Sequence, residues 1–275
     1  MSVDFSTDLL VLLCLMILTG SFAGFMAGLL GVGGGIVIVP TLFRLLELVD
    51  MDPGLRMHLA VGTSLATLIP TSLRSVGSHR RKGAVDEQLL RDWRIPLIVG
   101  VLLGSALAGF VTRRSLVTVF AVVATIVSLH MAFGRESWRI GERVPGGWAG
   151  RGMATVLGVL SALMGIGGGT LGVPLLTLFG YPIHRAVGTG AGLGLMVGIP
   201  GAIGFVISGW GIDGRPPWSL GYVNIIGFLA IVPMTILTAP LGARAAHAMS
   251  RVMLRRAFAL FLAATAVMLF RDLLR

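Results

Sequence analysis

A glycine-rich segment occurs twice in this chain, and each copy could bind an anion. Residues 31–42 read GVGGGIVIVPTL, and residues 165–176 read GIGGGTLGVPLL. Glycine allows positive φ angles and leaves backbone N–H groups uncovered. A helix that begins at such a turn also directs its positive N-terminal end at the turn. The pattern therefore predicts two anion-binding turns. The alternative interpretation is a tight turn or close helix packing.

The predicted binding residues come from both glycine copies and from the helices that follow them. The backbone N–H groups of the glycines could donate to an anion, as could neighbouring hydroxyl groups. These hydroxyls could equally cap helices. The candidates for substrate binding are Gly33, Gly34, Gly35, Thr63, Ser64, Gly167, Gly168, Gly169, Thr170 and Thr189.

Three basic side chains are further candidates for a proton or substrate role. His58 and His184 occupy equivalent positions, each shortly before a Val-Gly-Thr sequence. Histidine can carry a proton near neutral pH, although both residues could instead be hydrogen-bonded structural side chains. Arg74 lies near the end of an apolar segment. A cation there indicates a function unless its side chain reaches the membrane surface.

Acidic residues are informative through their positions. None of the 12 falls in the middle of an apolar segment. Proton-driven pumps usually contain a buried carboxylate or a histidine relay, so coupling here would depend on the histidines or be absent. A membrane potential that is negative inside favours anion exit by ~2.3 kcal/mol per charge per 100 mV. We therefore expect export of an anion driven by the potential.

The elements that must position these residues are long apolar segments. The chain is 55% hydrophobic and 12% charged, and a soluble domain carries about twice that charge. Several segments reach the length that spans a bilayer as a helix, and they are continuous rather than alternating. We expect an all-α, polytopic integral membrane protein with about eight to ten helical segments. The apolar segments lie at about 9–30, 33–48, 57–77, 95–112, 115–134, 149–166, 168–180, 185–208, 219–243 and 252–271.

The segments divide into two repeats of five. We expect a first transmembrane repeat at 1–134, a linker loop at 135–148 and a second repeat at 149–275. Because five is odd, the second repeat would enter the membrane in the opposite sense, which gives an inverted repeat. The short segments 33–48 and 168–180 could each turn back inside the membrane, so whether they span stays open.

Basic residues in the loops predict the orientation. Loop 79–94 carries five Lys or Arg residues, whereas its counterpart 209–220 carries one. Basic loops lie on the cytoplasmic side of a membrane, so this asymmetry predicts an N-terminus outside the cell.

Other function classes are disfavoured by what the sequence contains. The net charge of +10 comes from loops between apolar segments, which argues against nucleic-acid binding. The single cysteine, Cys14, allows no disulfide framework within one chain. We find no catalytic constellation, so an intramembrane enzyme or a scaffold is the alternative from another class. We expect no catalytic residues, cofactor or metal ion. The expected partners are a small anionic solute and the lipid bilayer, and the oligomeric state is open, with a homodimer as one option.

The chain resembles the TauE/SafE family of bacterial membrane transporters, also called the sulfite exporter family. The first half carries GLLGVGGGIVIVP at 28–40, HLAVGTSL at 58–65 and HRRKGAVD at 79–86. The second half carries MGIGGGTLGVPLL at 164–176, HRAVGTGAGLG at 184–194 and RPPWSLGYVN at 215–224. The resemblance extends over nearly the whole chain.

The resemblance implies a multi-pass carrier of the bacterial inner membrane with two related halves. Family members are associated with small sulfur-containing anions such as sulfite, sulfoacetate and related sulfonates, or with other organic acids. It therefore implies export of such an anion. Import of the same solute class, coupled to protons or sodium, is the alternative within transport.

Overall fold

The computed structural model describes residues 5–48, 51–133 and 140–273, and these residues form ten helices and one short hairpin. The all-α architecture predicted from the apolar segments is confirmed, and every predicted segment contains a helix. The elements are α1 (Phe5–Leu30), α2 (Gly35–Leu48), α3 (Pro53–Arg80), α4 (Glu87–Ala108), α5 (Arg113–Phe133), α6 (Gly147–Met164), α7 (Gly168–Leu178), α8 (Ile183–Ser208), β1 (Ser219–Leu220), β2 (Val223–Asn224), α9 (Ile225–Ala248) and α10 (Arg251–Leu273).

Capping residues explain where three helices begin. The side chain of Asp52 accepts a hydrogen bond from the N–H of Gly54, and Asp86 accepts one from Leu89. Asn224 caps α9 in the same way. These side chains satisfy N–H groups that a helix start leaves without partners. As a result α3 and α4 begin before the apolar segments predicted at 57–77 and 95–112. Segment 219–243 instead begins with the antiparallel hairpin β1–β2.

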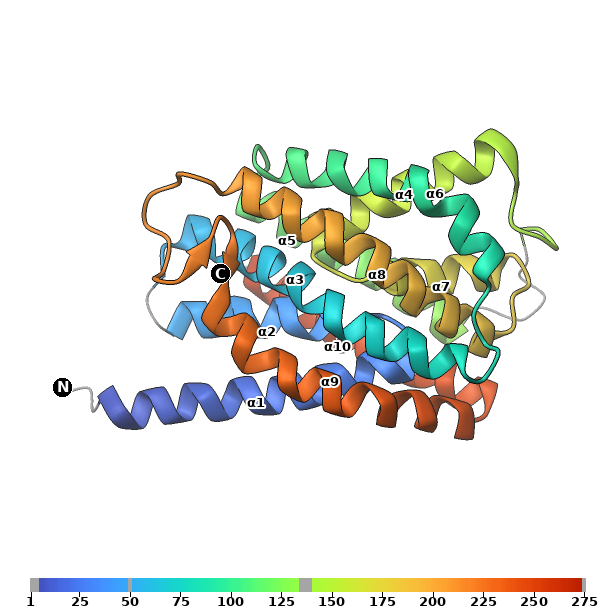
Figure 1. Ribbon diagram of the computed structural model, residues 1–275, viewed down its shortest axis with the longest axis horizontal. Coiled ribbons are helices and arrows are strands. Elements are labelled where there is room, and N and C mark those ends of the chain that lie inside the picture. Colours follow the sequence, from blue (N-terminus) through green and yellow to red (C-terminus); the bar gives the residue numbers. More distant parts are fainter. Residues whose placement is uncertain (1–4, 49–50, 134–139, 274–275) are drawn as a thin grey trace.

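The two shortest helices follow the glycine turns and reverse the direction of the chain. α2 has 14 residues and α7 has 11. Figure 1 shows α2 in the half of the molecule that holds the N and C labels, and α7 in the opposite half. The N–H of Ile140 also bonds the carbonyl of Leu178, which places the end of α7 beside the segment that leads into α6. Each short helix therefore returns toward the end from which the preceding helix set out.

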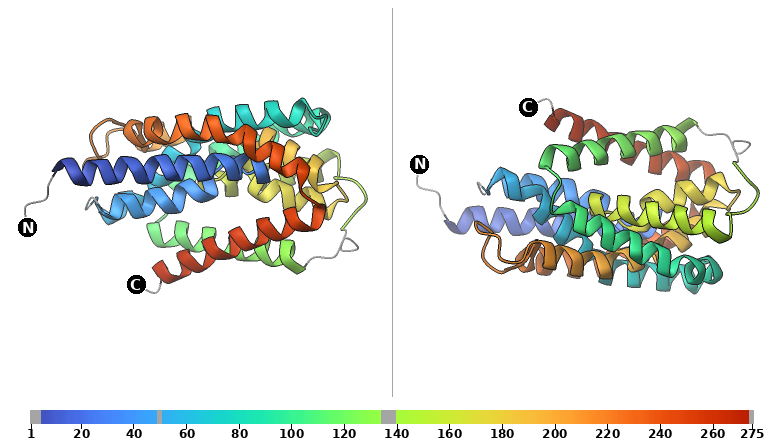
Figure 2. Two further views of the ribbon diagram at one scale, coloured as in Figure 1. Left: turned by 90° about the horizontal axis from the view of Figure 1, so that it is seen from below. Right: turned by 90° about the horizontal axis from the view of Figure 1, so that it is seen from above.

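Helix packing in the first half is repeated in the second. α1 packs on α9 as α6 packs on α4, and α2 packs on α3 as α7 packs on α8. The pairs α3–α8 and α5–α10 join the halves, and Figure 2 shows α5 and α10 side by side along one side of the molecule. The division into repeats at 1–134 and 149–275 stays a prediction. The proposed linker at 135–148 lies partly outside the described residues.

The outer surface is apolar, as a bilayer requires. Four helical stretches in the described residues are long and apolar enough to cross a membrane: Arg114–Phe133, Ile183–Ser208, Ile225–Ala248 and Val252–Arg271. Large hydrophobic side chains on several helices are exposed, including Leu102, Leu107 and Leu237. An apolar surface of this extent is covered by lipid in a multi-pass membrane protein.

Candidate functional site

The two glycine turns cross at the centre of the molecule. A Cβ added to Gly169 would overlap the carbonyl oxygen of Gly31, and one added to Gly35 would lie 2.5 Å from the carbonyl oxygen of Gly165. A Cβ on Gly33 would lie 3.6 Å from Cα of Gly167. The backbones of the two turns are therefore in direct contact. α2 and α7 begin at this contact, which we call the crossing (residues 31–36 and 165–170), and run toward opposite ends of the molecule (Figure 1).

Backbone donors collect at the crossing. Residues 31–36 and 165–170 are all buried. Within the described part of the chain, the N–H groups of Gly33, Gly34 and Gly35 have no hydrogen-bond acceptor, and neither do those of 167–169. Buried N–H groups are nearly always paired, so each unpaired one indicates a missing partner. The N-terminal ends of α2 and α7 add two positive partial charges at the same place. A small anion satisfies both requirements.

Two buried hydroxyl groups near the crossing have no partner in the described residues, and the sequence analysis named Thr170 but not Ser72. Thr170 is 1% exposed and its hydroxyl has no partner among the described residues. The hydroxyl of Ser72 is also buried and unpartnered, and its Oγ would lie 3.0 Å from a Cβ on Gly33. Ser64, a predicted binding residue, instead donates to the carbonyl of Gly165 at 2.7 Å. Ser72 lies two helical turns after Ser64 on α3, a spacing that could have indicated it.

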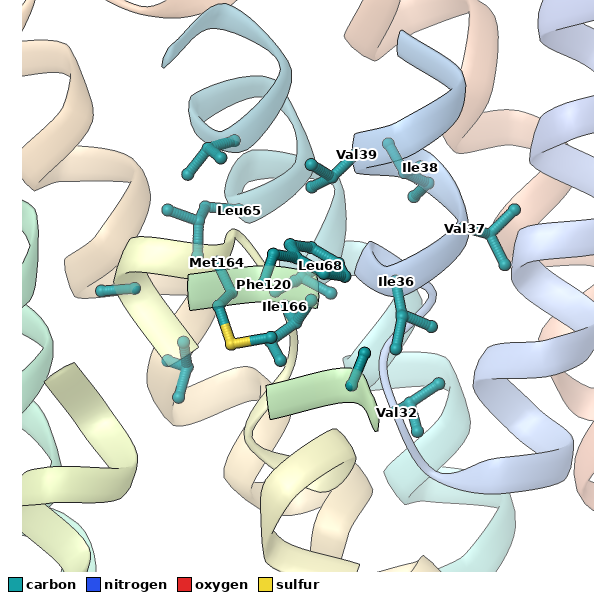
Figure 3. Close-up of a cluster of buried hydrophobic side chains, with 14 of the residues drawn as sticks. Val32, Ile36, Val37, Ile38, Val39, Leu65, Leu68, Phe120, Met164 and Ile166 are labelled. Atoms are coloured by element: carbon teal, nitrogen blue, oxygen red, sulfur yellow. The ribbon is translucent and has the colours of Figure 1, made fainter. Parts of the chain in front are cut away.

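Apolar side chains surround the crossing. Figure 3 shows Val32, Ile36, Phe120, Met164 and Ile166 gathered around it, and all five are 2% exposed or less. Such surroundings exclude water and lower the local dielectric, which strengthens the attraction between an anion and the N–H dipoles. Isolated formal charges are costly there.

Thr63 and Thr189 lie inside α3 and α8, and both hydroxyls accept hydrogen bonds from neighbouring elements. Thr63 accepts a hydrogen bond from the N–H of Asn224, and Thr189 accepts one from the N–H of Asp86, both at 2.9 Å. Each hydroxyl thus supports the cap residue of a neighbouring helix, α9 or α4. Neither hydroxyl caps its own helix, because α3 begins at Pro53 and α8 at Ile183. A role of Thr63 and Thr189 in substrate binding stays a prediction.

The two predicted histidines bond backbone carbonyls. Nε2 of His58 lies 3.0 Å from the carbonyl oxygen of Ala108, and Nε2 of His184 lies 3.1 Å from that of Ala246. These carbonyls belong to the last turns of α4 and α9, whose C-terminal carbonyls lack helical partners. Both histidines therefore tie helix ends to α3 and α8, which favours a structural role. The side chain of Arg74 is exposed on α3.

A pocket opens at each end of the molecule beside the corresponding cap residue. The pocket at the end with the β1–β2 hairpin, which we call the hairpin end, has a volume of about 190 Å³ and is mostly apolar, with Thr63 and Asn224 on its wall. The pocket at the opposite end has a volume of about 500 Å³ and contains Asp86, Tyr181 and Arg185. Equivalent positions thus present an amide at one end and a carboxylate at the other.

The carboxylate of Asp86 is held in its charged form. Its Oδ2 accepts hydrogen bonds from the Tyr181 hydroxyl and from Nη2 of Arg185, each at 2.9 Å. Burial alone would raise the pKa of Asp86, but the hydrogen bonds from Leu89 and Tyr181 and the Arg185 charge hold this pKa below its usual value. Burial and the bond to the carboxylate raise the pKa of Tyr181 to about 12. The hydroxyl therefore remains a donor at neutral pH.

Comparisons with known proteins agree with this architecture. The family model described as "Sulfite exporter TauE/SafE" matches residues 16–269. A "probable membrane transporter protein" of Haemophilus influenzae is 35% identical over 267 residues, which cover 94% of this chain and 98% of that protein.

More distant relatives carry similar names. A "probable membrane transporter protein" of Methanocaldococcus jannaschii is 25% identical over 88% of this chain and 86% of its own length. One of Bacillus subtilis, YunE, is 27% identical over 83% of this chain and 86% of its own. No solved structure matches the chain.

Proposed function

Because the chain belongs to the sulfite exporter TauE/SafE family and is a membrane transporter, we propose that it exports small anions and binds them at the crossing. The observation that carries this proposal is the set of buried, unpaired N–H groups from Gly33–Gly35 and Gly167–Gly169. Buried N–H groups without a partner favour binding of a hydrogen-bond acceptor. The positive N-terminal ends of α2 and α7 favour an acceptor that carries negative charge.

The size and chemistry of the crossing favour compact oxyanions. Its donors are backbone N–H groups and the hydroxyls of Ser72 and Thr170, which suit the oxygen atoms of a sulfite, sulfonate or carboxylate group. No Lys or Arg lies in residues 31–36 or 165–170. An anion held by dipoles rather than by a formal cation can leave again, as transport requires.

The distribution of charges supports the proposed direction of transport. The loops opposite the hairpin end, including residues 79–94, carry many of the basic residues, so we assign that end to the cytoplasm of a bacterial inner membrane. A potential that is negative inside drives an anion outward by ~2.3 kcal/mol per charge per 100 mV. The same potential opposes uptake, so an importer of these anions would need a coupled ion.

Flux in proteoliposomes tests the proposal. The purified protein is reconstituted with sulfite, thiosulfate, sulfoacetate, taurine or acetate, with an imposed potential and no pH or sodium gradient, and protein-free liposomes serve as the control. We expect flux of at least one sulfur-containing anion that follows the potential. Flux that appears only with a pH or sodium gradient would replace potential-driven export with coupled transport. No flux of any anion would refute the proposed substrate class.

A further inference from the structure

A stripe of buried polar side chains runs along α3 from the crossing toward the cytoplasmic end. Ser72, Ser75 and His79 are spaced by three and four residues, so they share one face of the helix. Ser75 donates to the carbonyl of Ala27 at 3.3 Å, and Nε2 of His79 lies 2.9 Å from the carbonyl oxygen of Gly28. The stripe thus follows the last turn of α1 before the first glycine turn.

His79 forms a pair with His247 of α9. Nδ1 of His79 lies 3.1 Å from Nε2 of His247. The carbonyl of Gly28 can only accept, so Nε2 of His79 carries a proton and donates it. In the neutral ring, Nδ1 of His79 is then the acceptor, and Nε2–H of His247 donates to it. His79 is fully buried, whereas His247 is partly exposed, so His247 is the member that faces solvent.

The equivalent positions on α8 are apolar, and the fold is the same there. Tyr222 donates to the carbonyl of Phe205 at 3.1 Å, as Ala84 donates to that of His79 at 3.1 Å, so Phe205 is the counterpart of His79. Gly201 and Gly198 lie four and seven residues before Phe205, as Ser75 and Ser72 lie before His79, so they occupy the equivalent positions on α8.

The counterpart of His247 is also small and apolar. His184 bonds the carbonyl of Ala246 as His58 bonds that of Ala108, so Gly109 occupies the position equivalent to His247. The helix packing therefore does not demand a histidine at either position. The polar stripe and the histidine pair are additions at the cytoplasmic end.

We propose that His79 and His247 form one proton-binding site on the cytoplasmic approach to the crossing, which takes up a proton when the anion enters. This inference rests on the proposed function, because the anion at the crossing supplies the charge that favours protonation. A proton from solution binds Nδ1 of His247, and its Nε2 proton moves to Nδ1 of His79. His247 is then neutral again, and His79 is an imidazolium that donates to the carbonyl of Gly28 in the last turn of α1. When the anion leaves, the two transfers reverse.

Few other charged groups face the pair. Lys82, in the loop after α3, and His184, on α8, are the other titratable groups whose charges act on both histidines. The rings of His184 and His247 are stacked, with centroids 5.7 Å apart. Arg80 is turned to Glu87, with bonds of 2.6 and 3.2 Å. The described side chains of α1, residues 14–30, include no acidic or basic group. A proton on His79 is therefore the charge nearest to the end of α1.

Thiosulfate flux from the cytoplasmic side tests the coupling, because the charge of thiosulfate stays constant between about pH 5 and pH 8, the range in which histidine titrates. We expect the KM of the native protein to fall by up to about tenfold per pH unit as the pH is lowered. His247→Gln keeps a donor to His79 and removes the ring that takes the proton from solution, so the pH dependence of its KM should be clearly weaker than that of the native protein. His184→Gln is the control and should keep the native dependence. A native KM that does not change with pH, or a His247→Gln variant that keeps the dependence, would overturn the proposal.

NMR of histidine-labelled protein tests the pair without any flux. The chain has five histidines, so single substitutions assign their signals. We expect the His79 and His247 signals to titrate together, and His247→Gln to change the titration of His79. Independent titration of the two rings would refute the paired site. Paired titration without flux of any anion would instead leave the proton site in place and refute the proposed function.

Discussion

The two glycine turns have nearly the same sequence but different backbone conformations. In the first turn, Gly31, Gly33 and Gly34 have positive φ angles of 68°, 73° and 84°. In the second turn only Gly165 does, with φ of 63°, and Gly167 has φ of −65°. α7 accordingly begins at Gly168, one position earlier than α2 in the aligned motifs.

The difference shows that the repeated glycines are retained for two physical reasons. In the first turn, glycine is required by a left-handed backbone that other residues adopt at a cost. In the second turn, the backbone is accessible to any residue at Gly167, but the first turn lies against it, and a Cβ there would overlap the carbonyl of Val32. Repetition of a motif therefore does not imply repetition of its conformation. The following substitutions, from the largest expected effect to the smallest, test this distinction.

Gly169→Ala should cause the largest loss. Its Cβ would overlap the Gly31 carbonyl, and neither backbone can move without separating the turns. We expect destabilisation of about 4 kcal/mol or more, together with loss of transport. Gly77→Ala is the matched control, because a Cβ there meets nothing within 4 Å. Thermal unfolding in detergent measures the stability of each variant, and flux in proteoliposomes measures its transport. Native stability in Gly169→Ala would show that the turns do not cross as described.

Gly33→Ala should have a smaller effect than Gly167→Ala, although the two positions are equivalent. At Gly33 the cost is a left-handed alanine, about 1–2 kcal/mol, plus displacement of the flexible Leu68 side chain, whose Cδ2 would lie 2.6 Å from the new Cβ. At Gly167 the obstacle is backbone. Melting temperatures of the two variants give the order directly, and the reverse order would contradict the distinction between strain and contact.

Ser72→Ala and Thr170→Val should weaken anion binding without lowering stability. Both remove a buried hydroxyl that has no partner in the described residues, and such a group costs about 1–3 kcal/mol when no ligand is bound. We expect the KM to rise about tenfold, with a melting temperature that is unchanged or higher. A variant with lower stability and an unchanged KM would show that the two hydroxyls stabilise the fold and do not bind the anion.

Thr63→Val and Thr189→Val should show the opposite behaviour. Each variant leaves the N–H of a cap residue, Asn224 or Asp86, without its acceptor. The expected loss is about 1–2 kcal/mol of stability, with little change in KM. A rise in KM at native stability would return these hydroxyls to the substrate site.

Asp86→Asn should have the smallest effect, and it makes the cap opposite the hairpin end resemble Asn224 at the hairpin end. Because the folded pKa of Asp86 lies below the unfolded value, its contribution is present above about pH 4 and is lost as the pH falls through the folded pKa. We expect the variant to lose about 0.5 kcal/mol at neutral pH, since Arg185 is half exposed. Its stability should depend less on acid than that of the native protein. If the stability of the variant and of the native protein depended on pH in the same way, Asp86 would not be the source of the acid sensitivity.

Much of the architecture follows from the sequence because it is local. Continuous apolar segments, glycine runs and their repetition predict the helices, including the two short ones, but leave open whether the short helices turn back. The starts of α3 and α4 were missed because the caps Asp52 and Asp86 lie in polar segments outside the apolar pattern. The hairpin before α9 was missed because its strands have two residues each, too few to show alternation.

The candidate site was predicted less completely because its contacts are long-range. The glycines of the crossing were found from their repetition, but the placement of Gly169 against Gly31 is set by tertiary packing. Ser72 and the pair His79–His247 have polar side chains without a polar counterpart in the other half. A search for repeated residues therefore passes over them, whereas the repeated Thr63 and Thr189 accept hydrogen bonds from the N–H groups of Asn224 and Asp86.

The most direct test of an anion site at the crossing is an anomalous difference map from crystals grown with selenite, the selenium analogue of sulfite. A selenium peak within hydrogen-bonding distance of the N–H groups of Gly33–Gly35 and Gly167–Gly169 is the predicted result. A peak only beside Arg185 in the pocket opposite the hairpin end, with none at the crossing in a protein that transports selenite, would contradict it.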